Sequence, residues 1–194
     1  MPQVKRWSGP KRNDWTVREY NRLYDLGAFR EQRVELIEGV IVEKALMTPG
    51  HAAGLELTRR ALEPAFGPGH WIRMQGPLRL GRRSELDPGL AVIPGGPRDN
   101  VAPPTTALLV VEISDEALAY DRRRKGSLYA RAGIADYWIV NLNRGQLEVY
   151  RRPIPVPSCR YGYGFSAMDV LGPDDHATPL AAPKARIAVA DLLP

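Results

Sequence analysis

Four residues that could do chemistry together lie within one stretch, LLVVEISDEALAYDRRRKGSLYARAG, residues 108–133: Glu112, Asp121, Lys125 and Tyr129. Glu112 ends an apolar run, where a charge is costly to bury unless it is paired, hydrogen-bonded or metal-bound. Asp121, Lys125 and Tyr129 follow at i, i+4 and i+8, so they share one face of a helix. If that helix returns along the sheet, Lys125 lies close to Glu112. A carboxylate that holds a divalent metal beside a lysine suits phosphodiester hydrolysis.

Each of these residues also has a simpler interpretation. Glu112 could pair with an arginine at the end of its strand. Asp121 and Lys125 could form an ordinary helix ion pair, worth only about 0.5 kcal/mol. Tyr129 could be a core residue. The residue types alone therefore leave both interpretations open.

Three consecutive arginines, Arg122, Arg123 and Arg124, extend the positive charge beside Lys125. They suit contacts with phosphates, although a run of charge is also typical of a solvated helix face. The whole chain has 27 Lys and Arg against 22 Asp and Glu, a net charge of +5. This excess permits a polyanionic partner without requiring one.

The stretch SELDPGLAVI, residues 84–93, raises the question of a second metal ligand. A metal-dependent enzyme would need a carboxylate at the mouth of the LAVI strand, but Gly89 occupies that position. Asp87 shares the face of Gly89 in extended backbone, about 6.5 Å back along the strand. The Pro88–Gly89 bend could swing Asp87 inward, because glycine tolerates unusual dihedral angles. Glu85 is a more distant candidate.

The elements that must position these residues follow from capping and periodicity. Thr16 and Glu19 form a capping box that opens a helix ending near Gly27. RVELIEGVIVEKA alternates about Glu38–Gly39, which predicts a hairpin with a tight turn. We expect further helices over 50–66 and 121–133. We expect strands over 70–81 (interrupted at Gly76–Pro77), 89–93, 107–114, 135–142 and 146–152.

This order predicts an α/β (α+β) fold: a mixed β-sheet flanked by helices, with extra hairpins. We expect a basic N-terminal arm over 1–14 and a single domain over 15–194. Its core would span 15–152, followed by an irregular extension over 153–194 with edge strands near 161–171 and 185–189. The single cysteine, Cys159, excludes an internal disulfide. With no apolar leader and no run long enough to span a bilayer, we expect a cytoplasmic protein that makes no membrane contact.

The chain resembles the Uma-two family of putative restriction endonucleases, within the PD-(D/E)XK nuclease superfamily, over roughly 15–152. The residues that carry the resemblance are TVREY, VELIEG, TPGH, GLAVIPG and above all VVEIS followed by D-x-x-x-K-x-x-x-Y and GIADYWIVN. The resemblance implies a four-stranded mixed sheet and Mg²⁺ (or Mn²⁺) held by an Asp and a Glu on neighbouring strands. The lysine usually lies two residues after the Glu, where this chain has Ser114. The family's variant moves it into the next helix, which here is Lys125.

The resemblance also adds two residues and exposes one departure. Glu35 matches an acid of the family pattern, and it could point toward the site or toward water. His51 matches a histidine after a Pro-containing turn, although capping or packing is the simpler role. Gly89 falls where the family has its Asp. The metal ligands implied here are therefore Asp87 and Glu112.

Three hypotheses of function follow. The first is a nuclease that hydrolyses nucleic-acid phosphodiesters, DNA foremost, with catalytic residues Asp87, Glu112, Lys125 and Glu35. Its substrate would be bound by Arg122–Arg124, His51 and Tyr129, and cutting both strands would favour a homodimer. The second is a nucleic-acid-binding module that has lost catalysis at Gly89. The third is a protein-interaction domain that dimerises through exposed Trp7, Trp15 and Tyr161–Tyr163.

Overall fold

The computed structural model describes residues 14–30 and 32–194. The expected basic arm, Trp7 included, lies outside the described residues apart from Asp14. The longer helices are α1 (Val17–Asp25), α2 (Pro49–Phe66) and α4 (Gly126–Arg131), with the short α3 (Leu118–Tyr120) before α4. The strands are β1 (Val34–Ile37), β2 (Val40–Glu43), β3 (His70–Met74), β4 (Leu78–Arg79), β5 (Glu85–Leu86), β6 (Leu90–Pro94), β7 (Leu109–Ser114), β8 (Asp136–Asn141), β9 (Gln146–Pro155), β10 (Tyr163–Leu171), β11 (His176–Ala177) and β12 (Ile187–Ala188).

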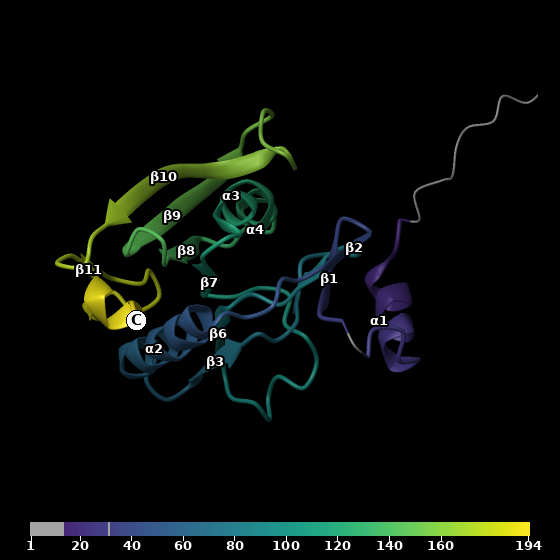
Figure 1. Ribbon diagram of the computed structural model, residues 1–194, viewed down its shortest axis with the longest axis horizontal. Helices are drawn as coiled ribbons and strands as arrows, with labels where there is room; N and C mark the ends of the chain where they lie inside the picture. Colours follow the sequence, from purple (N-terminus) through teal and green to yellow (C-terminus); the bar gives the residue numbers. More distant parts are fainter. Residues whose placement is uncertain (1–13, 31) are drawn as a thin grey trace, which may run out of the picture.

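The central sheet has six strands in the order β10-β9-β8-β7-β6-β3. Its apolar strands β6, β7 and β8 are buried almost throughout, which confirms that the three expected runs form one sheet. The β7–β8 pair is parallel and the other pairs are antiparallel. The expectation of four strands was therefore wrong. The chain extends the sheet with the long β9–β10 hairpin, visible along the upper left of Figure 1.

Each face of this sheet has its own cover. Helix α2 and the C-terminal segment pack on one face, around Leu62, Trp138 and Val189. Helix α4 packs on the other face through Leu128 and Tyr129. Figure 1 shows α2 beside the C-terminus and α3 and α4 grouped on the side of the sheet nearer β1 and β2. Apolar residues alternate between these two cores, so strand β7 is covered on both faces.

A second, four-stranded sheet has the order β2-β1-β5-β4. Its hairpin turns at Glu38 and Gly39, which both have positive φ, as the expected tight turn requires. Helix α1 begins with the complete Thr16–Glu19 capping box, and it packs on this sheet through Tyr20, whose hydroxyl donates to the Val34 carbonyl at 2.9 Å. The sheet therefore carries α1 on one face and leaves Glu35, on the other face of β1, free to point elsewhere.

The helix expected over 121–133 is interrupted by a π-helical turn over Asp121–Lys125. In this turn the Gly126 amide donates to the Asp121 carbonyl, five residues back. The wider turn still keeps Asp121, Lys125 and Tyr129 on one buried face. Turns of this kind are frequent at functional sites, and this one lies where Lys125 meets the sheet.

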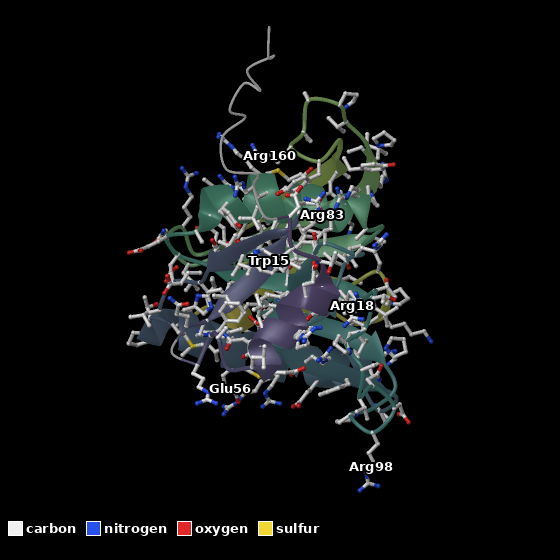
Figure 2. The ribbon with its side chains drawn as sticks, turned by 90° about the vertical axis from the view of Figure 1, so that its right-hand side faces the viewer. Trp15, Arg18, Glu56, Arg83, Arg98 and Arg160 are labelled. Atoms are coloured by element: carbon white, nitrogen blue, oxygen red, sulfur yellow. The ribbon has the colours of Figure 1, made fainter. Side chains whose placement is uncertain are left out.

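The aromatic residues expected to mediate dimerisation are half-buried among the described residues. Trp15 packs against the cluster between α1 and β1, and Tyr161 packs beneath the Arg131 guanidinium, 5.3 Å from its ring centre. Figure 2 places Trp15 on the face that carries α1, next to its outward-pointing Arg18. These contacts hold Trp15 and Tyr161 in the fold of one chain, and a role for them in association stays a prediction.

Candidate active site

Glu112 and Lys125 meet at the buried end of strand β7. The Nζ atom of Lys125 donates to Oε1 of Glu112 at 2.9 Å, and the Tyr129 hydroxyl donates to the same oxygen at 2.7 Å. The Gly89 amide donates to Oε2 of Glu112 at 3.2 Å. Such bonds fix the direction of the carboxylate. The expectation that Lys125 reaches Glu112 is confirmed.

Glu35 is the second carboxylate of this cluster. It is buried, and its Oε1 lies 3.6 Å from Nζ of Lys125 and 3.0 Å from Nζ of Lys44. Burial opposes its charge, but Lys125 and Lys44 outweigh that effect and lower the pKa of Glu35. Glu35 therefore points toward the site and remains ionised there, so the alternative of a solvated side chain was wrong.

Lys125 is held in its charged form by its neighbours. Burial opposes the charge, but the carboxylates of Glu112, Glu35 and Asp121 outweigh it and raise the pKa of Lys125. Asp121 lies one helical turn away, at 3.9 Å from Nζ. Burial and the Glu112 charge raise the pKa of Asp121 to about 7. A buried ammonium between two carboxylates can stabilise negative charge on a bound group without leaving its place.

Lys44 is a site residue that the sequence analysis missed. Besides Glu35, its Nζ binds the Asp87 carbonyl at 2.7 Å, and it lines the same pocket as Lys125. The hairpin register pairs Glu35 with Val42, so Lys44 lies two residues further along on the same face. The turn at Glu38–Gly39 was expected from the sequence, so the register was a signal that could have identified Lys44.

Asp87 lines this pocket together with Glu112, Glu35 and Lys125. Its amide donates to Oε1 of Glu35 at 3.0 Å, which ties the turn before β6 to strand β1. Burial raises the pKa of its carboxyl to about 6. Within the described residues, that carboxyl makes no hydrogen bond or ion pair. The half-buried Asp87 carboxyl is therefore free to accept a hydrogen bond or to bind a ligand.

Gly89 is required by the close approach of β6 to β7. A Cβ atom at this position would lie 2.9 Å from the Val111 carbonyl oxygen and 3.3 Å from the Leu55 side chain. A side chain at residue 89 would therefore point against strand β7 and α2. Restoring an aspartate here would not simply restore a ligand, which contradicts the interpretation of Gly89 as an empty ligand position in this backbone.

The pocket carries an excess of negative charge. Six carboxylates and three basic side chains line it: Glu35, Glu43, Asp87, Glu112, Asp115, Asp121, and Arg33, Lys44, Lys125. Mg²⁺ prefers oxygen ligands and is usually held by one or two carboxylates together with waters and substrate phosphates. No group of three or more His, Cys, Asp or Glu side chains is close enough to hold a metal ion within the described part of the chain. A cation at this pocket would therefore have to rely on one or two carboxylates together with waters or a substrate.

The remaining candidates have mixed outcomes. Tyr129 is fully buried, so it orients Glu112 and cannot contact a substrate as expected. Arg122 makes two hydrogen bonds to the buried Glu148, through Nε at 2.8 Å and through Nη2 at 2.5 Å. Its guanidinium is thus engaged in the fold through Nε and Nη2, and the expected phosphate contact of Arg122 stays a prediction.

Arg123, Arg124 and His51 remain available to a ligand in different degrees. Arg123 is exposed, and Arg124 lies over the Tyr120 ring at 5.5 Å from its centre. The amide of His51 donates to the Thr48 hydroxyl, which caps α2, while its half-buried ring lines the pocket. Burial lowers the pKa of His51, which favours its neutral form.

Comparison with known proteins agrees with this picture. No curated protein matches the chain. A crystal structure described as a putative nuclease belonging to DUF820, from Anabaena variabilis, matches with a TM-score of 0.67 and 18% sequence identity over 92% of this chain and 97% of that chain. This likeness shows that the two proteins share a fold. Among the described residues, no helix combines the length and apolar character that a membrane span needs.

The family model described as "Putative restriction endonuclease" (Uma2) matches residues 17–172, which is most of the chain and includes Glu35, Asp87, Glu112 and Lys125. The match thus spans the six-stranded and four-stranded sheets and every residue that lines the pocket. The chain belongs to this Uma2 family of restriction-endonuclease-like proteins.

Proposed function

We propose that the protein is a nuclease that hydrolyses phosphodiester bonds of nucleic acid at the Glu112–Lys125 pocket, with DNA as its first substrate. One observation carries the proposal. A buried lysine bridges the carboxylates of Glu112 and Glu35, next to the unpartnered Asp87 carboxyl. Structural ion pairs of this depth are costly to bury, so a reactive role explains them better than stability does. The family supports the same reaction class.

The chain's own residues divide the work. Lys125 stabilises negative charge on the phosphoryl group, or orients the attacking water, from a position fixed by Glu112 and Glu35. Lys44, more exposed than Lys125, is placed to bind a neighbouring phosphate oxygen. Tyr129 and the Gly89 amide orient Glu112.

The excess of carboxylates would repel a phosphodiester unless a cation offsets it. Asp87 and Glu112 would hold Mg²⁺ or Mn²⁺, which would supply Lewis-acid stabilisation of the phosphoryl oxygens. A homodimer would place two such pockets on the two strands of a duplex. Both the cation and the dimer belong to the proposal.

Asp87→Asn is the sharpest test, because the Asp87 carboxyl makes no bond in the described residues and its loss should leave the fold intact. Labelled DNA, single-stranded and duplex, is incubated with wild type in Mg²⁺ or in EDTA. We expect cleavage in Mg²⁺ only, abolished in Asp87→Asn and kept in the control Asp169→Asn, an exposed acid on β10. Wild-type cleavage that Asp87→Asn leaves unchanged would overturn the proposed site.

A second candidate function rests on Gly89. If the turn before β6 holds Asp87 too far from Glu112, the protein would bind nucleic acid without cutting it. Salt-dependent DNA binding with no cleavage and no Mn²⁺ binding by calorimetry would favour this alternative.

A further inference from the structure

The reactive groups lie at the bottom of a pocket rather than in an open cleft. Glu35, Glu112, Asp121 and Lys125 are 3%, 5%, 3% and 7% exposed. The phosphates of a regular duplex lie on a stiff backbone, with every base stacked and paired. A phosphate can reach this depth only if the nucleotide beside it enters the pocket as well.

Apolar side chains in the outer wall of the same pocket are exposed to solvent. Leu46 and Met47, in the loop between β2 and α2, line the pocket, yet Leu46 is 90% exposed. Covering an exposed leucine removes apolar surface from water, which lowers the free energy and favours binding. The loop continues directly from Lys44, so the apolar wall begins two residues after a proposed phosphate contact.

Tyr120 also lines this pocket. Its ring lies beneath the Arg124 guanidinium. Its hydroxyl is buried and has no hydrogen-bond partner in the described residues. The ring itself is only partly buried. An aromatic ring in the wall of a pocket can stack on a base.

We propose that the substrate presents an unpaired nucleotide to this pocket, with its base against Leu46, Met47 and Tyr120 and its phosphate at Lys44 and Lys125. The inference rests on the proposed nuclease function and names its substrate class, single-stranded or locally unpaired nucleic acid. An aromatic side chain beside a basic groove is the usual platform for such strands. The apolar wall suits the base, and the two lysines suit the phosphate once the proposed cation offsets the carboxylates around them.

An exposed apolar residue outside the pocket provides a control for Leu46. Val101, in the Pro-rich loop between β6 and β7, is 89% exposed but does not line the pocket. Arg98 of the same loop stands at the tip of the molecule in Figure 2, away from its body. Val101→Ala therefore removes an equally exposed apolar side chain and serves as the matched control for Leu46→Ala.

Fluorescence anisotropy measures binding directly, with Ca²⁺ in place of Mg²⁺ and four labelled probes of one sequence: single-stranded DNA, single-stranded RNA, a perfect duplex, and a duplex with one unpaired nucleotide. We expect the single strands and the unpaired duplex to bind at least about tenfold more tightly than the perfect duplex. Base stacking is worth about 1–3 kcal/mol, so Tyr120→Ala should weaken these probes by about fivefold to a hundredfold.

Variants separate the parts of the pocket. Tyr120→Phe tests the hydroxyl alone and should lose less than Tyr120→Ala. Leu46→Ala should weaken single-strand binding, whereas Val101→Ala should not. Thermal melts establish that each variant is folded, and the Leu46 and Val101 changes are at exposed sites that folding tolerates.

The outcomes distinguish this inference from the function on which it rests. A perfect duplex bound as tightly as the single strands, with Leu46→Ala and Tyr120→Ala silent, would overturn the inference and leave the nuclease proposal standing. Failure of all four probes to bind would overturn both. The RNA and DNA single strands share the proposed chemistry, and a difference between them assigns the 2′-hydroxyl as a contact or as an obstacle.

Discussion

The Nζ atom of Lys125 lies 2.9 Å from Oε1 of Glu112, although the two residues come from a helix and a strand 13 positions apart in the sequence. The same nitrogen lies 3.6 Å from Glu35 on a different sheet. Lys125 thus joins the two sheets at the pocket. Replacing Lys125 should therefore change the stability of the fold as well as catalysis.

Lys125→Met should destabilise the protein strongly. It leaves Glu112 and Glu35 buried without their shared cation, a loss that typically costs about 3–5 kcal/mol. Urea unfolding followed by tryptophan fluorescence measures the change. The control Lys184→Met removes an exposed lysine and should change little. Equal stability of the two variants would mean that Lys125 is not the electrostatic partner of these carboxylates.

Gly89→Asp should lower the free energy of unfolding and should not improve metal binding. Its Cβ would press on the Val111 carbonyl, and overpacking of this kind costs about 1–3 kcal/mol. Gly89→Ala, which adds the Cβ alone, should show most of the loss. In Gly50→Ala, the matched control, the new Cβ meets no atom within 4 Å, so no loss is expected. Tighter Mn²⁺ binding by Gly89→Asp at unchanged stability would restore the interpretation of residue 89 as a lost ligand.

The arginines after Asp121 should separate into one structural and one binding residue. Arg122→Ala leaves the buried Glu148 without its charged partner and should cost about 1–3 kcal/mol of stability. Arg123→Ala should leave stability unchanged and reduce the salt slope of nucleic-acid binding by about one unit. Urea unfolding measures the stability of each variant, and binding measured between low and moderate salt gives each salt slope. A flattened slope in Arg122→Ala alone would reverse the assignment.

Glu148 should make the protein sensitive to acid. Burial opposes its charge, but bonds from Arg122, Tyr150 and Asn141 outweigh burial and lower its pKa in the folded protein. Its stabilising contribution is therefore complete above the unfolded pKa, about 4.3, and is lost as pH falls through the lower, folded value. Unfolding free energies of wild type and Glu148→Gln are measured at pH 7 and at pH 3. The difference between the two proteins should be smaller at pH 3. A difference between the two proteins that stays constant with pH would contradict this.

The sequence predicted those parts of the site that depend on local pattern. The apolar run before Glu112 predicted a buried strand, and the spacing of Asp121, Lys125 and Tyr129 predicted one helical face, which the π-helical turn preserves. The Glu38–Gly39 turn predicted the hairpin that carries Glu35. In each case the informative residues are neighbours along the chain.

The contacts that escaped prediction join residues far apart in the sequence. Glu148 is 26 residues from Arg122, and no local spacing reveals which charge a long arginine will meet. Gly89 was interpreted from alignment with a motif, whereas its real constraint is the Val111 backbone across the strand pair. Lys44 could have been predicted from the sequence, because the hairpin register places it beside Glu35.

The central claim is that the Glu112–Lys125 pocket hydrolyses nucleic-acid phosphodiesters. The most direct measurement is the single-turnover rate of DNA cleavage in Mg²⁺ by wild type and by Glu112→Gln, prepared identically and shown by thermal melting to be folded. We predict that wild type cleaves and that Glu112→Gln is slower by at least about a hundredfold. A folded Glu112→Gln variant that cleaves at the wild-type rate would contradict the claim.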